Sequence, residues 1–229
     1  MRDRLADSGF SGTVPVFPLP EVVFFPDALL PLHVFEPRYR AMVDAARTGE
    51  GLIAVATLLP GWEKDAEGAP AFHPLATVGR MVAIHDHPDG RSDILLRGLE
   101  RVRLEEEYAS HPWRLAGART VPDSALPDDD PELDESVRRL LVAYEYTRHL
   151  TQSGEDPTAA ADDEMSREGV IHTVCQNLPV PAFHRLRALE ATGPAERMPM
   201  ARAWLAERLD AALAEHRLPR LALVGGEAN

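Results

Sequence analysis

The chain has 229 residues, of which 45% are hydrophobic, so it can bury a core as one large domain or two small ones. Its formal net charge is −13, which argues against nucleic acid as a partner because phosphate binding requires a basic surface. Its one cysteine, Cys175, excludes an internal disulfide and a site built from several thiolates.

The first twelve residues are polar and small, and they lack the apolar run of a signal peptide. No stretch approaches the roughly 18 apolar residues of a membrane span. We therefore expect a cytoplasmic protein that does not associate with membranes.

An extended apolar stretch covers residues 14–39 and reads VPVFPLPEVVFFPDALLPLHVFEPRY. Each proline removes a backbone donor and favours extended backbone in the residue before it. Proline is poorly tolerated in the middle of a sheet, so we expect short strands at sheet edges or strands broken by bulges. Pro37 is suited to the first position of a helix that runs to residue 47, and Gly49 supplies its stop.

This stretch resembles the opening of the Lon protease amino-terminal (substrate-binding) domain family. The residues that match the family pattern are Pro18, Leu19, Pro26, Pro31, Leu32, Phe35, Glu36, Arg38 and Tyr39. We expect a structural role for Pro18, Pro31, Phe35, Glu36, Arg38 and Tyr39. The resemblance implies a PUA-like barrel and a role in recognising proteins.

Short apolar or alternating segments follow at 52–59, 78–87, 92–97, 101–104 and 113–121. Their length and turn-rich flanks predict strands, and Pro88, Asp89 and Gly90 predict a hairpin turn. The first part of the chain, residues 11–122, should therefore form a β-barrel or sandwich of about six short strands with one inserted helix.

Residues 122–131 are rich in proline and aspartate and predict a linker or an exposed crossing. Apolar residues then recur at helical spacing, so residues 131–217 should form a bundle of four helices, the last over 198–216. Asp130 can cap the first of them. The predicted fold class is α+β. Cys175 lies among apolar residues at helical spacing, so burial explains it better than catalysis.

A Lon protease also needs an ATPase module and a serine–lysine peptidase module. The chain has no GxxxxGK[ST] phosphate loop, and its only lysine, Lys64, lies between Glu63 and Asp65, which favour the protonated amine. We therefore expect a recognition domain standing alone that is not an enzyme, needs no cofactor and has an ATPase or protease as a candidate partner.

Histidines offer one alternative, a metal-dependent or His/Glu-based hydrolase. His85 and His87 share a strand face near Asp86 and Asp89, but a zinc site would need a further ligand from elsewhere, so we predict no metal. His33 and Glu36 are a conceivable acid–base pair, although pairing of Glu36 with Arg38 or a backbone amide is the simpler interpretation.

The main hypothesis is a non-catalytic module that binds protein or peptide segments. Its candidate contact residues are Trp62, Phe72, Trp113 and His33. Trp62 and Phe72 lie in a loop of charged residues, where an apolar ring has little local cover and can form an exposed contact patch. Folding of Trp62 and Phe72 back onto the barrel is the alternative for those two rings. A PUA-like RNA-binding module is a further alternative that the acidic charge disfavours.

Overall fold

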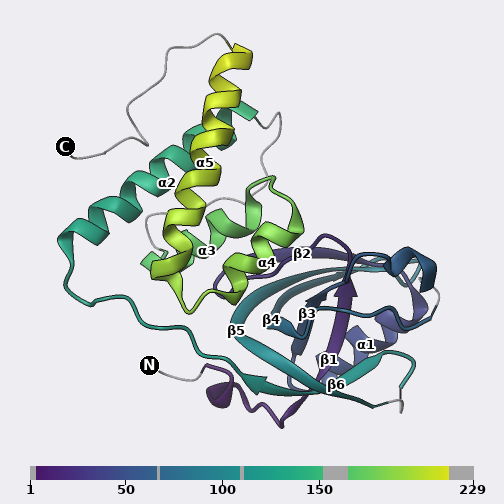
Figure 1. Cartoon of the computed structure of the whole chain (residues 1–229). Coiled ribbons are helices and arrows are strands. Elements are labelled where there is room, and N and C mark those ends of the chain that lie inside the picture. Colours follow the sequence, from purple (N-terminus) through teal and green to yellow (C-terminus); the bar gives the residue numbers. More distant parts are fainter. Residues whose placement is uncertain (1–3, 66–67, 109–110, 152–164, 217–229) are drawn as a thin grey trace.

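The computed structural model describes residues 4–65, 68–108, 111–151 and 165–216. Strands occupy the first half of the chain and helices dominate the second, so the predicted α+β class is confirmed (Figure 1). Within the described residues the strands are β1 Thr13–Leu19, β2 Leu29–Val34, β3 Leu52–Thr57, β4 Leu75–Asp86, β5 Ser92–Tyr108 and β6 Arg114–Thr120.

The strands lie in the order β2-β5-β4-β3-β1-β6, and β5 also pairs with β6. This additional pairing closes β1, β3, β4, β5 and β6 into a ring and leaves β2 at the edge, on the first half of β5. β3 is buried on both faces: Leu52, Ala54 and Ala56 join the cluster inside the ring, whereas Ile53 and Val55 pack toward helix α1, Pro37–Thr48. The strands thus form a closed barrel, one of the two arrangements, barrel or sandwich, that the strand spacing left open.

β5 is one continuous strand of 17 residues, whereas separate strands were expected at 92–97 and 101–104. Gly98 does not interrupt it. Instead, its missing side chain lets the chain after Phe25 cross close by, with Gly98 N donating to Ala28 O at 2.9 Å and Asp27 N donating to Gly98 O at 3.0 Å.

β1 lies inside the sheet, so the expectation that the proline-rich strands stay at edges is wrong for β1 and correct for β2. The reason is that the two neighbours of β1 pair with different halves of it. β6 pairs with residues 13–16 and β3 with residues 16–19, so Pro15 and Pro18 each lie in a half with a neighbour on one side. The missing N–H of each proline therefore need not interrupt a ladder.

The local signals at turns and caps predicted the structure well. At the predicted turn, Gly90 N donates to His87 O at 2.9 Å and Gly90 has a φ of 81°. Asp130 accepts from the backbone of Glu132 and Leu133 at 3.1 and 3.0 Å, which caps the first helix of the second half as expected.

The helices of the second half are α2 Pro131–Thr151, α3 Arg167–Asn177, α4 Ala182–Glu190 and α5 Pro194–His216. α5 begins four residues before the predicted start at 198, because its first turn is anchored by Arg197, which is fully buried. Among the described residues, no helix is both long enough and apolar enough to cross a bilayer.

The helical half shares a core with the β1–β2 connection, which lies against it in Figure 1. Val23, Phe25 and Ala28 belong to the same buried cluster as residues from all four helices. Gln176 on α3 accepts from Phe25 N at 3.1 Å and donates to Leu29 O at 2.7 Å. The division into domains 11–122 and 131–217 stays a prediction.

Cys175 lies within this shared core and is fully buried. Burial raises the pKa of its thiol to about 12. Because the thiolate is the reactive form, the structure favours the packing role that the sequence predicted for Cys175.

His172 is another buried polar group, on α3. Arg197 lies against it, with Nη1 2.7 Å from His172 Nε2. A guanidinium can only donate, so Nε2 accepts and the ring carries its proton on Nδ1, 3.8 Å from Asp27 Oδ2. Burial lowers the pKa of His172 below 6.5, and the adjacent Arg197 charge adds to the effect. Burial opposes ionisation of Asp27, but His172 and Arg4 stabilise its charge and lower its pKa to about 2.

The free energy of unfolding should therefore fall as the pH drops below 6.5. The unfolded chain takes up a proton at His172 that the folded state resists, so this contribution is complete above 6.5 and is lost in acid. We expect His172→Gln, whose amide oxygen can still accept from Arg197, to flatten the dependence between pH 6.5 and about pH 5. Urea unfolding across this range measures it, and parallel slopes for the two proteins would contradict the assignment.

Candidate binding groove

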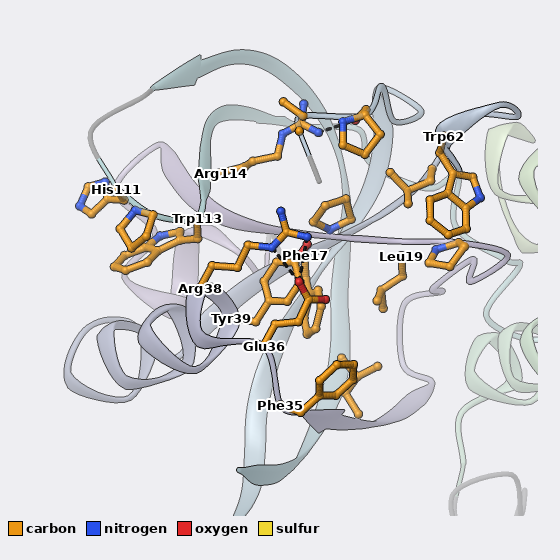
Figure 2. Close-up of a pocket in the computed structure, with 18 of the residues that line it drawn as sticks. Phe17, Leu19, Phe35, Glu36, Arg38, Tyr39, Trp62, His111, Trp113 and Arg114 are labelled. Atoms are coloured by element: carbon orange, nitrogen blue, oxygen red, sulfur yellow. Dashed lines mark hydrogen bonds and ion pairs between the residues drawn. The ribbon is translucent and has the colours of Figure 1, made fainter. Parts of the chain in front are cut away.

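An apolar groove lies on the barrel beside α1 (Figure 2). Its volume is about 640 Å³, within the range of protein ligand pockets. Four segments line it: the end of β1, the end of β2 with the corner before α1, the loop after β3, and the segment that leads into β6. Residues far apart in the sequence therefore converge on one surface.

The floor of the groove is aromatic. Phe17 on β1 and Tyr39 on α1 lie with ring centroids 4.3 Å apart, and both side chains are buried. Burial raises the pKa of Tyr39, so its hydroxyl stays neutral at physiological pH. The floor thus offers a neutral ring surface.

A charged pair lies on this floor. Arg38 donates from Nε to Glu36 Oε2 at 3.0 Å, and its guanidinium carbon is 4.7 Å from the Tyr39 ring centroid. This contact agrees with the expected pairing of Glu36 and Arg38. Glu36 also precedes α1, where its carbonyl oxygen accepts from Tyr39 N at 3.0 Å. The pair fixes the corner and neutralises two charges that face the groove.

Trp62 and Trp113 lie at opposite ends of the lining, with Phe17 and Tyr39 between them (Figure 2). Both tryptophans are half-buried. The Nε1 of Trp113 is buried, and no acceptor for it lies among the described residues. These two predicted contact residues are therefore brought to the same groove.

Phe72 lies elsewhere. It packs against the cluster inside the barrel, and the guanidinium carbon of Arg114 is 4.1 Å from its ring centroid. Arg114 in turn lines the groove and donates to Pro70 O at 2.6 Å. Phe72 thus supports the groove wall through Arg114 without lining it.

The rim carries Phe35 and His33. Phe35 is 59% exposed, the highest value among the exposed large hydrophobic side chains of the described residues. His33 bonds Asp93 through Nδ1 at 2.6 Å, whereas Glu36 bonds Arg38. The acid–base pair considered for a hydrolase is thus not assembled. Of the remaining pattern residues, Pro18 is buried in the lining and Pro31 is exposed on β2.

Electrostatically the groove differs from the chain as a whole. In the part of the lining that the structure describes, Glu36 is the only acidic residue, and Arg38 neutralises it. Arg114 adds a positive charge. The described lining is therefore mostly apolar and poor in acidic residues, although the chain has a net charge of −13.

The sequence did not identify several lining residues, among them Phe17, Leu19 and Leu58. Phe17 and Leu19 belong to the stretch interpreted as framework, and Leu58 lies near the end of the segment 52–59, which was predicted to be buried. Their signal was present in the aromatic and aliphatic content of those segments. What was missing was the pairing of β1 with β3, which places these segment ends side by side.

The closed barrel, the helical half packed on it and this groove define an α+β protein with an apolar groove on its barrel. The chain belongs to the family of the ATP-dependent protease La (LON) substrate-binding domain, whose family model matches residues 13–207. The match confirms the resemblance found in residues 14–39.

Curated relatives include Lon proteases. The Lon protease of Rhizobium meliloti is 24% identical over 221 residues, which cover 95% of this chain and 27% of that protein. The Lon protease of Flavobacterium johnsoniae is 22% identical over 188 residues, which cover 81% of this chain and 23% of that protein. The chain thus spans about a quarter of the length of these relatives.

Solved structures share the fold. The amino-terminal domain of the Mycobacterium avium complex Lon protease superposes with a TM-score of 0.59 at 16% identity, covering 85% of this chain and 98% of that one. A Lon N-terminal domain protein from Xanthomonas campestris gives a TM-score of 0.58 at 23% identity, covering 84% of this chain and 98% of that one.

Proposed function

We propose that this chain is a non-catalytic module that binds apolar segments of unfolded or flexible proteins in the groove between Trp62 and Trp113. The observation that carries the proposal is the convergence of aromatic and aliphatic side chains on one groove of about 640 Å³. Family membership in a substrate-binding domain supports it.

The physical chemistry of the groove favours an apolar segment over a charged ligand. Aromatic anchors in a partly closed groove supply most of the binding energy in protein recognition. The Glu36–Arg38 pair is already neutral, so it can donate and accept at the edges of a bound chain without demanding a charged partner. His33, Trp62, Trp113, Phe35 and Tyr39 are the proposed contact residues, and Phe72 acts behind them.

The relatives that match are named Lon proteases, so a Lon-type ATPase and peptidase is the proposed partner of this module. The module would hold the segment while the partner performs the bond cleavage. A cytoplasmic location is part of the same proposal.

Phe35→Ser tests the groove without disturbing the core, because Phe35 is 59% exposed. We expect the variant to bind a fluorescein-labelled, carboxymethylated and permanently unfolded lactalbumin about tenfold more weakly than the wild type. Fluorescence anisotropy measures the affinity, with native lactalbumin as the probe that should not bind.

Phe183→Ser is the matched control. Phe183 is 58% exposed, on α4 and outside the groove lining, so the same substitution removes a similar ring from another surface. It should leave the affinity unchanged. Equal losses in the two variants would show non-specific hydrophobic contact, and no binding by the wild type would contradict the proposal directly.

A further inference from the structure

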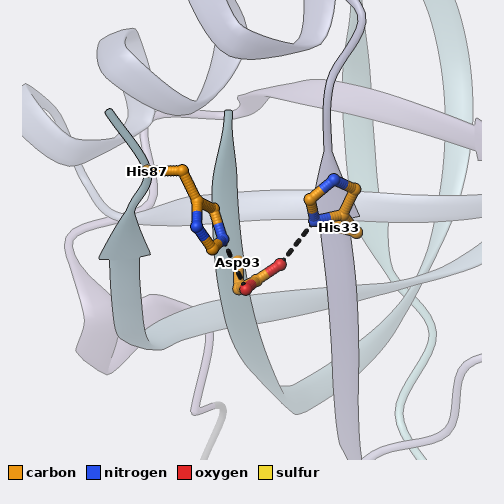
Figure 3. A group of neighbouring side chains, drawn as sticks. All are labelled: His33, His87 and Asp93. Atoms are coloured by element: carbon orange, nitrogen blue, oxygen red, sulfur yellow. Dashed lines mark hydrogen bonds and ion pairs between the residues drawn. The ribbon is translucent and has the colours of Figure 1, made fainter. Parts of the chain in front are cut away.

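Three side chains that can bind a metal meet on the outer face of β2, β5 and the turn after β4. His33 on β2 pairs directly with Asp93 on β5 in the strand register. His87 follows β4, and its backbone N–H donates to Arg91 O at 2.8 Å, which holds it beside the start of β5. Figure 3 shows both imidazoles directed at the Asp93 carboxylate.

The distances within this cluster are short. His33 Nδ1 lies 2.6 Å from Asp93 Oδ1, and His87 Nε2 lies 2.7 Å from Asp93 Oδ2. The three candidate ligand atoms all lie within 4.8 Å of one another. Two imidazoles and one carboxylate are a donor set typical of zinc and other divalent transition metals.

The neighbouring carboxylates have other partners. Asp86 receives two hydrogen bonds from Arg47, at 3.1 and 2.8 Å, and Asp89 receives two from Arg91, from the backbone N at 3.1 Å and from Nε at 2.7 Å. The Asp93 carboxylate, by contrast, bonds the two histidines. The acids that the sequence placed near His85 and His87 are therefore engaged by arginine, and the third ligand comes from Asp93, whose position depends on strand pairing.

Metal binding requires only small movements. Tetrahedral Zn²⁺ with bonds of about 2.0–2.1 Å separates its ligand atoms by about 3.3 Å, slightly more than the present hydrogen bonds. The side chains would open by a fraction of an ångström to about one ångström, and each ring would carry its proton on the nitrogen remote from the metal. His33 and Asp93 are fixed by adjacent strands, so the backbone is already placed.

We propose that His33, His87 and Asp93 form a surface site for a divalent transition-metal ion, Zn²⁺ in the first instance, with water in the remaining position. The site lies at the rim of the groove because His33 also belongs to its lining. It differs from the earlier candidates, since Glu36 contributes no ligand and His85 contributes none. The proposal does not depend on peptide binding.

Calorimetric titration of the chelator-treated, tag-free protein with ZnCl₂ tests the site. We expect one ion per chain, and binding weakened at least about tenfold in each of His33→Ala, His87→Ala and Asp93→Asn, because each removes one of three ligands. All three side chains are substantially exposed, so the variants should fold, which circular dichroism checks.

His85→Ala is the control, because the His85 ring lies 5.0 Å from that of His87 on the same surface. It should bind Zn²⁺ like the wild type. Co²⁺ should give the intense absorption of a low-coordinate site in the wild type and in His85→Ala, and lose it in the three ligand variants. Absence of Zn²⁺ binding, or an equal loss in His85→Ala, would overturn the proposal.

Discussion

Replacing Asp123 with alanine is expected to lower the free energy of unfolding by about 3–5 kcal/mol. Asp123 lies in the connection between barrel and helices and joins two arginines. Arg101 on β5 reaches it at 2.6 Å, and Arg197 on α5 binds it through both Nη atoms, Nη2 at 2.7 Å. Both guanidinium groups are almost completely buried, so loss of the shared carboxylate leaves two buried cations close together.

The arginines also hold the backbone at the end of α4. Arg101 donates to Leu189 O at 2.6 Å, and Arg197 donates to Ala188 O at 2.9 Å. The network therefore connects strand, linker and two helices, and its loss should weaken both halves of the fold together. Burial, followed by the adjacent Arg197 charge, lowers the pKa of Arg101, which shows how strongly this site depends on a counter-charge.

Urea unfolding followed by circular dichroism measures the change. Asp128→Ala is the control, since Asp128 is exposed in the same connection, and it should change stability by less than about 0.5 kcal/mol. Asp123→Asn keeps an oxygen acceptor, so its loss of stability should lie between those of Asp123→Ala and Asp128→Ala. It provides the test if the alanine variant does not fold. A cost below about 1 kcal/mol for Asp123→Ala would contradict the role of this carboxylate.

Asp123 also shows where prediction from the sequence ended. Local signals were sufficient for the cap at Asp130, the helix start at Pro37 and the turn at Gly90, because each acts within a few residues. The same signals presented residues 122–131 as a linker. They could not show that one of its acids is largely enclosed by arginines, since the partners of Asp123 lie 22 and 74 residues away.

The same limit applies to the candidate groove, whose lining the sequence indicated only in part. Of the predicted contact residues, Trp62 and Trp113 line the groove, whereas Phe72 lies behind its wall. The difference is set by Arg114, which covers the Phe72 ring. Likewise, His33 and Asp93 are 60 residues apart, and only the β2–β5 register places them opposite each other.

Gly98→Ala is expected to lower the free energy of unfolding by about 3 kcal/mol, as overpacking in a core does. A Cβ at this position would overlap the carbonyl oxygen of Phe25 and lie 3.0 Å from both the Phe25 carbonyl carbon and Pro26 Cα. All of these are backbone atoms, so no side-chain rotation can relieve the overlap.

The crossing chain is also held from its other side. Phe25 is fully buried, and its N–H donates to Gln176 on α3, so the segment cannot retreat from β5 without disturbing the helical half. Gly61→Ala is the comparison variant. A Cβ at Gly61 meets nothing within 4 Å, but the φ of 88° is unfavourable for alanine, so the substitution should lower the free energy of unfolding by about 1 kcal/mol. If thermal and urea unfolding place Gly98→Ala at or below the cost of Gly61→Ala, the tight crossing of residues 25–28 over β5 does not limit stability. A larger loss for Gly98→Ala means that backbone contact with β5 holds the proline-rich stretch on the barrel. Only glycine at position 98 leaves room for that contact.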